Sequence, residues 1–294
     1  MSVFNVCKPL IGVVHLPPLP GSPGYRRARF PDVGGGTWGI EGIVEYAVSQ
    51  AKIYESAGFD GVIVENYGDK PYTLRAGKGQ VAAMAYIVGS VARELSIPVG
   101  VNMLRNSGYE AVYAAHITGA RFVRVNNLCE LRVSQEGIMY PEARRIARAL
   151  SELNIYDEVQ SGKLAIMADI NVKHSSPIAP TMNTKDMVRD CVERSGIPIY
   201  SIIITGARTG EEPGYDRVEE ILPVARELRV ELYIGSGVSH TNIMKYWSVG
   251  DGFIVGTSVK TGGRTENPVS EEKASALARL VKHAREVIGC RERG

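Results

Sequence analysis

Eight short segments rich in apolar and β-branched residues recur along the chain, with amphipathic stretches between them. The segments span 10–16, 61–66, 98–104, 121–127, 164–172, 199–206, 231–237 and 252–258. In several of the intervening stretches apolar residues return every three or four positions, as in 43–54, 81–95, 218–228 and 274–288. Strict alternation of strand and helix requires parallel strands, and eight units favour a closed barrel over an open doubly wound sheet. We predict one α/β domain, a (β/α)8 TIM barrel, over residues 1–294.

Polar residues in the predicted strands share one parity and lie close to the strand ends. In 164–172 the apolar Ile166, Ala168 and Ile170 alternate with polar positions, and alternate residues of a barrel strand face the helices and the lumen. By the same reasoning we expect the polar residues of all the strands to face the lumen: His15, Glu65, Asn102, Arg124, Asn126, Asp169, Asn171, Lys173 and Thr205. Unpaired charges in a dry lumen cost several kcal/mol, so we expect a wet pocket at the barrel mouth. The alternative is a structural polar layer in which Arg124 neutralises Glu65 or Asp169.

The last two predicted strands both end in a glycine turn with hydroxyl groups. One turn is Gly235-Ser236-Gly237, followed by a helix-like stretch from Asn242, and the other is Gly256-Thr257-Ser258. Glycine lets backbone N–H groups approach an anion, hydroxyls add donors, and a helix N-terminus adds positive potential. Because a phosphate site often follows strands 7 and 8 of such barrels, the pair predicts a phosphate cup.

Two long connections follow predicted strands, at 17–39 and 67–79. Both therefore belong to the C-terminal face, where barrels carry their active sites and where long loops often act as lids. The alternative is that these Pro- and Gly-rich loops only cap the barrel.

Composition narrows the classes of partner and compartment. The 294 residues carry 34 Lys and Arg against 32 Asp and Glu, a net charge of +2, which is too balanced for a general nucleic acid binder. Cys7, Cys129, Cys191 and Cys290 are far apart without a CxxC pair, which argues against a structural zinc site and against a disulfide framework. The N-terminus lacks a signal peptide pattern, and no stretch reaches the ~20 apolar residues of a membrane span. We expect a cytoplasmic protein.

Several motifs together resemble the BtpA/SgcQ family of ribulose-phosphate-binding barrels. They are His-Leu-Pro-Pro-Leu-Pro-Gly-Ser-Pro at 15–23, Glu-Asn-Tyr-Gly-Asp at 65–69, Gly-Val-Asn-Met-Leu-Arg-Asn at 100–106, Arg-Val-Asn at 124–126, Ala-Asp-Ile-Asn-Val-Lys-His at 168–174, and the cup. The resemblance implies a barrel with a phosphate cup and no settled reaction, since members are associated with photosystem I accumulation or with a sugar-utilisation operon. The chain departs from the family at 134–137, Ser-Gln-Glu-Gly, where Thr-Asp-Gln-Gly is expected.

The favoured hypothesis is an enzyme of lyase, isomerase or epimerase type acting on a phosphorylated sugar or similar metabolite. Glu65 or Asp169 would be the general base, Lys173 would stabilise an enolate or form a Schiff base, and His15 would donate a proton. The remaining polar residues would contact the substrate: Asn102, Arg105, Arg124, Asn126, Asn171 and Thr205.

Other hypotheses remain open. We expect no cofactor, but His15, Glu65, Asp169 and His174 are N/O donors that could bind a divalent metal ion. A second class is a non-catalytic assembly or regulatory factor that binds a phosphorylated ligand. A nucleotide hydrolase and a Rossmann dehydrogenase are disfavoured, because neither GxxxxGK[ST] nor GxGxxG is present in the required place. A homo-oligomer is compatible with the sequence.

Overall fold

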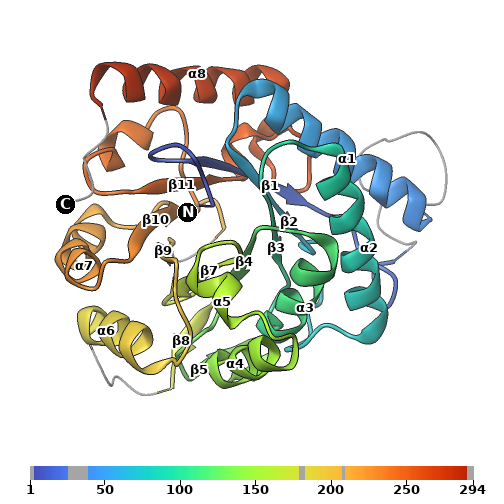
Figure 1. Ribbon diagram of the computed structural model, residues 1–294. Helices are drawn as coiled ribbons and strands as arrows, with labels where there is room; N and C mark the ends of the chain where they lie inside the picture. The colour runs from blue at the N-terminus through green and yellow to red at the C-terminus, as the bar shows by residue number, and fades with distance from the viewer. Residues whose placement is uncertain (1–2, 26–38, 179–182, 207–208, 290–294) are drawn as a thin grey trace.

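The computed structural model describes residues 3–25, 39–178, 183–206 and 209–289, and within them the eight predicted strands form a closed parallel barrel (Figure 1). The order around the barrel is β1-β11-β10-β9-β7-β4-β3-β2. The strand bounds are β1 (Leu10–His15), β2 (Gly61–Glu65), β3 (Val99–Asn102), β4 (Phe122–Val125), β7 (Ala165–Ile170), β9 (Ser201–Ile204), β10 (Glu231–Gly235) and β11 (Gly252–Val255). The predicted TIM barrel is confirmed.

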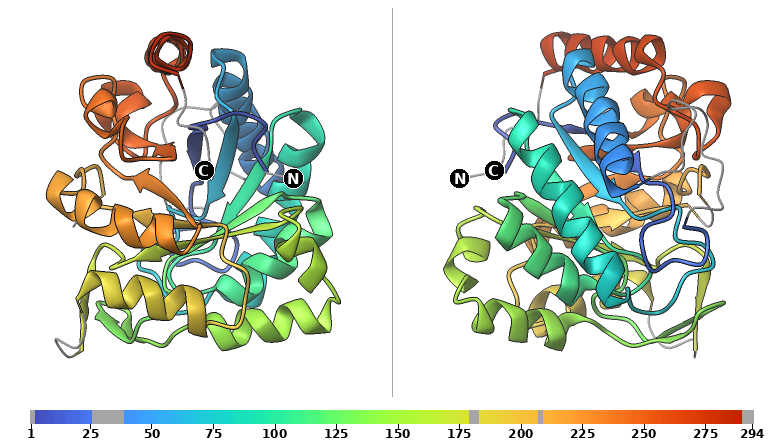
Figure 2. Two further views of the ribbon diagram at one scale, coloured as in Figure 1. Left: turned by 60° about the vertical axis from the view of Figure 1, so that its left-hand side comes forward. Right: turned by 90° about the vertical axis from the view of Figure 1, so that its right-hand side faces the viewer.

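Helices surround the barrel, and α8 lies beside α1 to complete the ring (Figures 1 and 2). The bounds are α1 (Ile40–Ala57), α2 (Lys78–Glu94), α3 (Gly108–Thr118), α4 (Ala143–Glu152), α5 (Tyr156–Gln160), α6 (Thr184–Arg194), α7 (Tyr215–Glu227) and α8 (Glu271–Val287). Three short 3-10 turns complete the set: η1 (Ile243–Tyr246), η2 (Thr257–Val259) and η3 (Thr261–Gly263). Local signals set the ends of these helices, since Asn183 and Ser270 cap α6 and α8, and Gly58 ends α1 at φ 94°.

The barrel lumen is filled by one face of the strands, and the other face packs against the helices. Val13, Ile63 and Ile203 belong to the inner cluster, as the parity argument predicts, whereas the valines of β3 and β4 belong to the outer core. The N-terminal segment closes the lumen from below with Phe4, whose ring lies 5.4 Å from that of Phe122. These apolar layers stop short of the C-terminal strand ends, which leaves that face to polar residues.

The loops that follow β4 and β7 form an additional antiparallel sheet that the sequence pattern does not predict. Its strands are β5 (Arg132–Ser134), β6 (Gly137–Met139) and β8 (Ser175–Pro177), in the order β6-β5-β8. Three-residue strands of mixed polarity are too short to show a period of two. The predicted lid at 17–39 falls partly outside the described residues, because 26–38 are not among them.

A disulfide joins Cys129, in the loop after β4, to Cys191 on α6, and the Cα atoms are 5.4 Å apart. Cys7 is also disulfide-bonded. The prediction that the cysteines form no disulfide framework was therefore wrong. Residues 62 apart in sequence meet because adjacent βα units bring the β4 loop against α6, and sequence spacing does not reveal such a meeting.

Removing this bridge should destabilise the fold measurably. Closing a loop of this length restricts the unfolded chain, so Cys129→Ser/Cys191→Ser should lower the free energy of unfolding by about 2 to 4 kcal/mol. Urea denaturation under oxidising conditions measures the difference. Equal midpoints for the wild type and the double variant would contradict the bridge.

Candidate functional site

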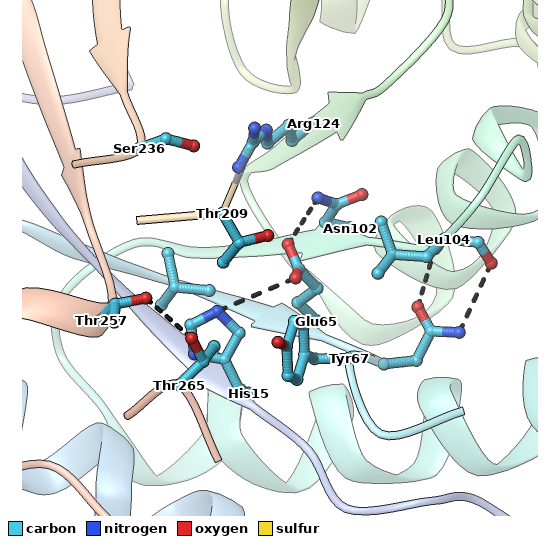
Figure 3. A network of polar contacts seen from close by, with 12 residues as sticks. His15, Glu65, Tyr67, Asn102, Leu104, Arg124, Thr209, Ser236, Thr257 and Thr265 are labelled. Atoms are coloured by element: carbon cyan, nitrogen blue, oxygen red, sulfur yellow. Dashed lines mark hydrogen bonds and ion pairs between the residues drawn. The ribbon is translucent and has the colours of Figure 1, made fainter. Parts of the chain in front are cut away.

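Glu65 stands at the centre of a row of polar side chains across the barrel mouth. Strand register creates this row, since His15 pairs with Glu65, Glu65 with Asn102, and Asn102 with Arg124. The Asn102 amide donates to Glu65 Oε2 at 2.8 Å, and His15 Nε2 lies 3.8 Å from Glu65 Oε1. Figure 3 shows the Glu65 carboxylate between these two side chains. One oxygen of Glu65 is thus held by an amide, while the other faces the imidazole.

Arg124 and Asp169 form a buried bidentate pair next to this row. Arg124 Nε and Nη2 donate to the two carboxylate oxygens at 2.9 Å each, and the Asn126 amide adds a third bond at 3.0 Å. Burial alone would lower the pKa of Arg124, but the charge and hydrogen bonds of Asp169 outweigh it and raise the pKa. Because Asp169 is committed to these donors, it is a poorer candidate base than Glu65.

His15 is an uncharged imidazole at neutral pH. Burial lowers its pKa well below the usual value, and the positive charges of Lys260, Lys173 and Arg124 lower it further. The ring stands edge-on to Tyr67, with centroids 5.0 Å apart. A Cβ at Gly256 would lie 2.7 Å from His15 Cε1, so a side chain at that turn would displace the ring.

The two predicted phosphate turns lie side by side. The Ser258 hydroxyl donates to the Val238 carbonyl at 2.6 Å and links them. Ser236 has φ 64°, a left-handed conformation that residues other than glycine rarely adopt outside special sites. At Gly237, also left-handed, a Cβ would lie 2.2 Å from the backbone nitrogen of Glu212. Glycine at position 237 therefore lets the backbone at 211–212 pack directly against this turn.

A small recess of about 30 Å³ brings the turns and the charged row together. Its lining combines Ser236, Gly237, Gly256, Thr257 and Ser258 with His15, Glu65, Arg124 and Lys173. The stretch after Asn242 differs from the prediction, because it forms only the four-residue η1 and offers no extended helix dipole. Positive charge comes instead from Lys173, whose amine donates to Ser236 Oγ at 3.4 Å.

Lys173 has a weakened affinity for its proton. Burial lowers the pKa of its amine to about 8, with the positive charge of Arg124 adding to the effect and Glu65 and Asp169 opposing it. An ammonium group at this position suits a phosphate or an enolate oxygen, and the neutral fraction is available as a nucleophile.

A wider cavity of about 680 Å³ adjoins the recess and shares Glu65, Lys173 and Thr209 with it. Its walls include Tyr67, Tyr72, Arg105 and Glu136. Glu136 comes from the segment that departs from the family pattern, and its carboxylate lies 3.5 Å from Arg105 Nε. The sequence marked that departure but could not show that the carboxylate faces the cavity.

Two residues predicted to contact the substrate, Asn171 and Thr205, line neither cavity at the barrel mouth. Asn171 has φ 53° just after β7 ends, which changes the direction of the chain. Its backbone N–H donates to Glu130 Oε1 at 2.6 Å, and its side-chain oxygen accepts from Arg132. It lines a groove of about 1070 Å³ on the outside of the barrel, and the prediction that it faces inward was wrong. Thr205 is fully buried and lines neither cavity of the barrel mouth. The side-chain amides of Asn102 and Asn126 donate hydrogen bonds to Glu65 and Asp169 and hold these carboxylates in place.

The residues of the metal alternative do not converge. His174 Nε2 lies 3.1 Å from the Thr209 hydroxyl, and Asp169 is held by Arg124. Among the described residues no three His, Cys, Asp or Glu side chains are grouped as metal ligands.

A further buried amine, Lys260, was not predicted as a site residue. It is completely buried, and burial lowers its pKa to about 7 against the opposing charge of Glu65.

The fold and the mouth define a (β/α)8 barrel with a polar, ligand-sized opening at its C-terminal face. The chain belongs to the BtpA family, whose model matches residues 6–283. It is 40% identical over 279 residues to an uncharacterised protein of Pyrococcus horikoshii, covering 95% of this chain and 98% of the relative. It is 33% identical over 279 residues to the photosystem I biogenesis protein BtpA of Synechocystis, covering 94% and 88%.

Solved structures agree on the fold. Dihydropteroate synthase of Xanthomonas albilineans superposes with a TM-score of 0.59 at 15% identity, covering 98% of this chain and 95% of the other. None of the helices in the described ranges has the length and apolar character needed to cross a membrane.

Proposed function

We propose that the chain is an enzyme that binds a phosphorylated sugar or similar small metabolite at the barrel mouth and moves a proton next to a carbonyl group, as lyases, isomerases and epimerases do. The observation that carries the proposal is the shared recess, in which two glycine turns lie against Glu65, His15 and Lys173.

The phosphate would occupy the recess. Backbone groups at Ser236 and Gly237, the η2 turn and the Lys173 ammonium supply donors and positive charge from several sides. The remainder of the metabolite would extend into the wider cavity, which opens from the same residues.

Glu65 would act as the base. It lines both spaces, and one of its oxygens is free of the amide that holds the other. The neutral His15 imidazole beside it would donate or relay a proton, and Lys173 would stabilise the enolate oxygen. A Schiff base at Lys173 is the second version of this chemistry.

A non-catalytic binding factor is the second candidate, because a relative at 33% identity is named a photosystem I biogenesis protein. Such a factor would need the cup but not a base and a lysine beside it. Ligand binding without any chemistry on the ligand would favour this candidate.

The cup is tested by a charge placed inside it. Ser236→Asp puts a carboxylate in the recess, and Ser236→Asn is its matched control, since both residues tolerate the left-handed backbone and have nearly the same size. We expect glucitol 6-phosphate and inorganic phosphate to raise the melting temperature of the wild type and of Ser236→Asn, but not of Ser236→Asp. The proposal fails if phosphorylated compounds stabilise none of the three, or if all three respond equally.

The pH dependence of phosphate affinity should follow Lys173. With a pKa of about 8, its amine is mostly protonated at pH 7 and mostly neutral at pH 9. The affinity for inorganic phosphate should therefore fall as pH rises through 8, by up to about tenfold per unit. Lys173→Arg stays protonated and should hold its affinity over the same range. Calorimetric titrations at pH 7, 8 and 9 measure this, and parallel decline in both proteins would contradict it.

A further inference from the structure

The guanidinium of Arg105 is a buried cation with few partners on the wall of the wider cavity. Arg105 is 3% exposed, and its hydrogen bond in the described structure runs from Nη2 to the Lys173 carbonyl at 3.0 Å. Its Nε is buried without a hydrogen bond, because Glu136 Oε2 lies 3.5 Å away as an ion pair only. A guanidinium has five N–H donors, and among the described residues one of them, on Nη2, forms a hydrogen bond.

Neighbouring charges do not satisfy this capacity. Glu136 is the acidic partner, and it reaches the guanidinium at one nitrogen without the bidentate geometry that Arg and carboxylate favour. Lys70, another cation of the cavity wall, is turned toward Glu266 at 3.4 Å and lies over the Tyr67 ring. A buried charge with incomplete pairing is costly, and an oxyanion from the cavity would complete it.

The position of Arg105 relative to the cup is fixed through Lys173. The Lys173 carbonyl accepts from Arg105, while its amine reaches Ser236 in the recess. A lysine spans at most about 8 Å from its carbonyl oxygen to its amine. With the two hydrogen bonds added, the Arg105 guanidinium and the Ser236 hydroxyl are therefore no more than about 14 Å apart. An open-chain molecule of four to six carbons covers that distance.

We infer that the ligand of this site carries a second oxyanion, a carboxylate or a second phosphate, which Arg105 binds while the first phosphate occupies the cup. The inference rests on the proposed function and narrows its substrate class to phosphorylated sugar acids or sugar bisphosphates. The cavity of about 680 Å³ is within the range that encloses ligands of this size or larger.

A pair of ligands that differ at one end tests the inference. Glucitol 6-phosphate ends in a hydroxymethyl group and 6-phosphogluconate in a carboxylate, while fructose 1,6-bisphosphate carries a second phosphate. Hydrogen bonds to charged groups are worth about 10- to 100-fold in affinity. We expect 6-phosphogluconate or the bisphosphate to bind the wild type about 10- to 100-fold more tightly than glucitol 6-phosphate, and the stronger of the two identifies the second group.

Variants assign the gain to Arg105. Arg105→Gln should abolish the preference for the doubly charged ligands over glucitol 6-phosphate, whereas exposed Arg75→Gln should keep it. Glu136→Gln removes the competing carboxylate and should strengthen binding of the doubly charged ligand several-fold, which keeps the test intact if Arg105→Gln does not fold. Equal wild-type affinities for all three ligands overturn the inference but leave the cup standing. Failure of every ligand to bind overturns the proposed function itself.

Discussion

Glu65→Gln should lower the rate of solvent deuterium incorporation into a bound phosphorylated aldose or ketose by about 10²- to 10⁴-fold, the usual contribution of a positioned base. Glutamine retains an oxygen for the Asn102 amide, so the row across the mouth should persist and ligand affinity should change little. Proton NMR of phosphorylated sugars in deuterium oxide follows the exchange.

The control for this experiment is Glu266→Gln, a partly exposed carboxylate at the mouth that contacts Tyr67 and Lys70 rather than His15. It should retain the wild-type rate. Wild-type protein that binds phosphorylated sugars and exchanges none of their protons would support the binding factor over the enzyme. An unchanged rate in Glu65→Gln would remove Glu65 from the role of base.

Arg124→Leu should destabilise the fold by about 3 to 5 kcal/mol, because it strands the carboxylate of Asp169 in a buried site. The double variant Arg124→Leu/Asp169→Leu should recover most of this loss, since an apolar pair of similar volume replaces both charges. Urea denaturation gives the free energies of unfolding.

An exposed bidentate pair gives the comparison. Arg189 and Glu227 meet on the surface between α6 and α7, so Arg189→Leu should cost less than about 1 kcal/mol. If Arg124→Leu costs no more than Arg189→Leu, the Arg124–Asp169 pair does not stabilise the fold as a buried ion pair should.

Strand periodicity was sufficient to predict most of the fold and many of the residues at the barrel mouth. Alternation is informative near the C-terminal end of a barrel strand because the face toward the helices stays apolar, while the face toward the mouth can be polar. It therefore turned Glu65, Arg124 and Asp169 inward correctly. The argument failed one residue past the strand, at Asn171, because a left-handed residue resets the direction of the chain and parity has no meaning beyond it.

Other features have no local signal. The Cys129–Cys191 bridge depends on two loops meeting in space, and the β5-β6-β8 sheet depends on three-residue strands that pair across loops. Lys260 follows β11 in an irregular turn, where no period indicates that its amine is buried. Arg105 and Glu136 form an ion pair between the loops after β3 and β4, and no local sequence pattern indicates that these loops meet.

The missing side chain at Gly256 has an evolutionary consequence. A Cβ at position 256 would overlap the imidazole of His15. A substitution at one of these positions therefore restricts which residues the other can accept. A family member with alanine or a larger residue at the β11 turn would need a smaller residue, or a displaced ring, at the end of β1. Naturally occurring substitutions should thus occur together at these two sites, although they are 241 positions apart along the chain.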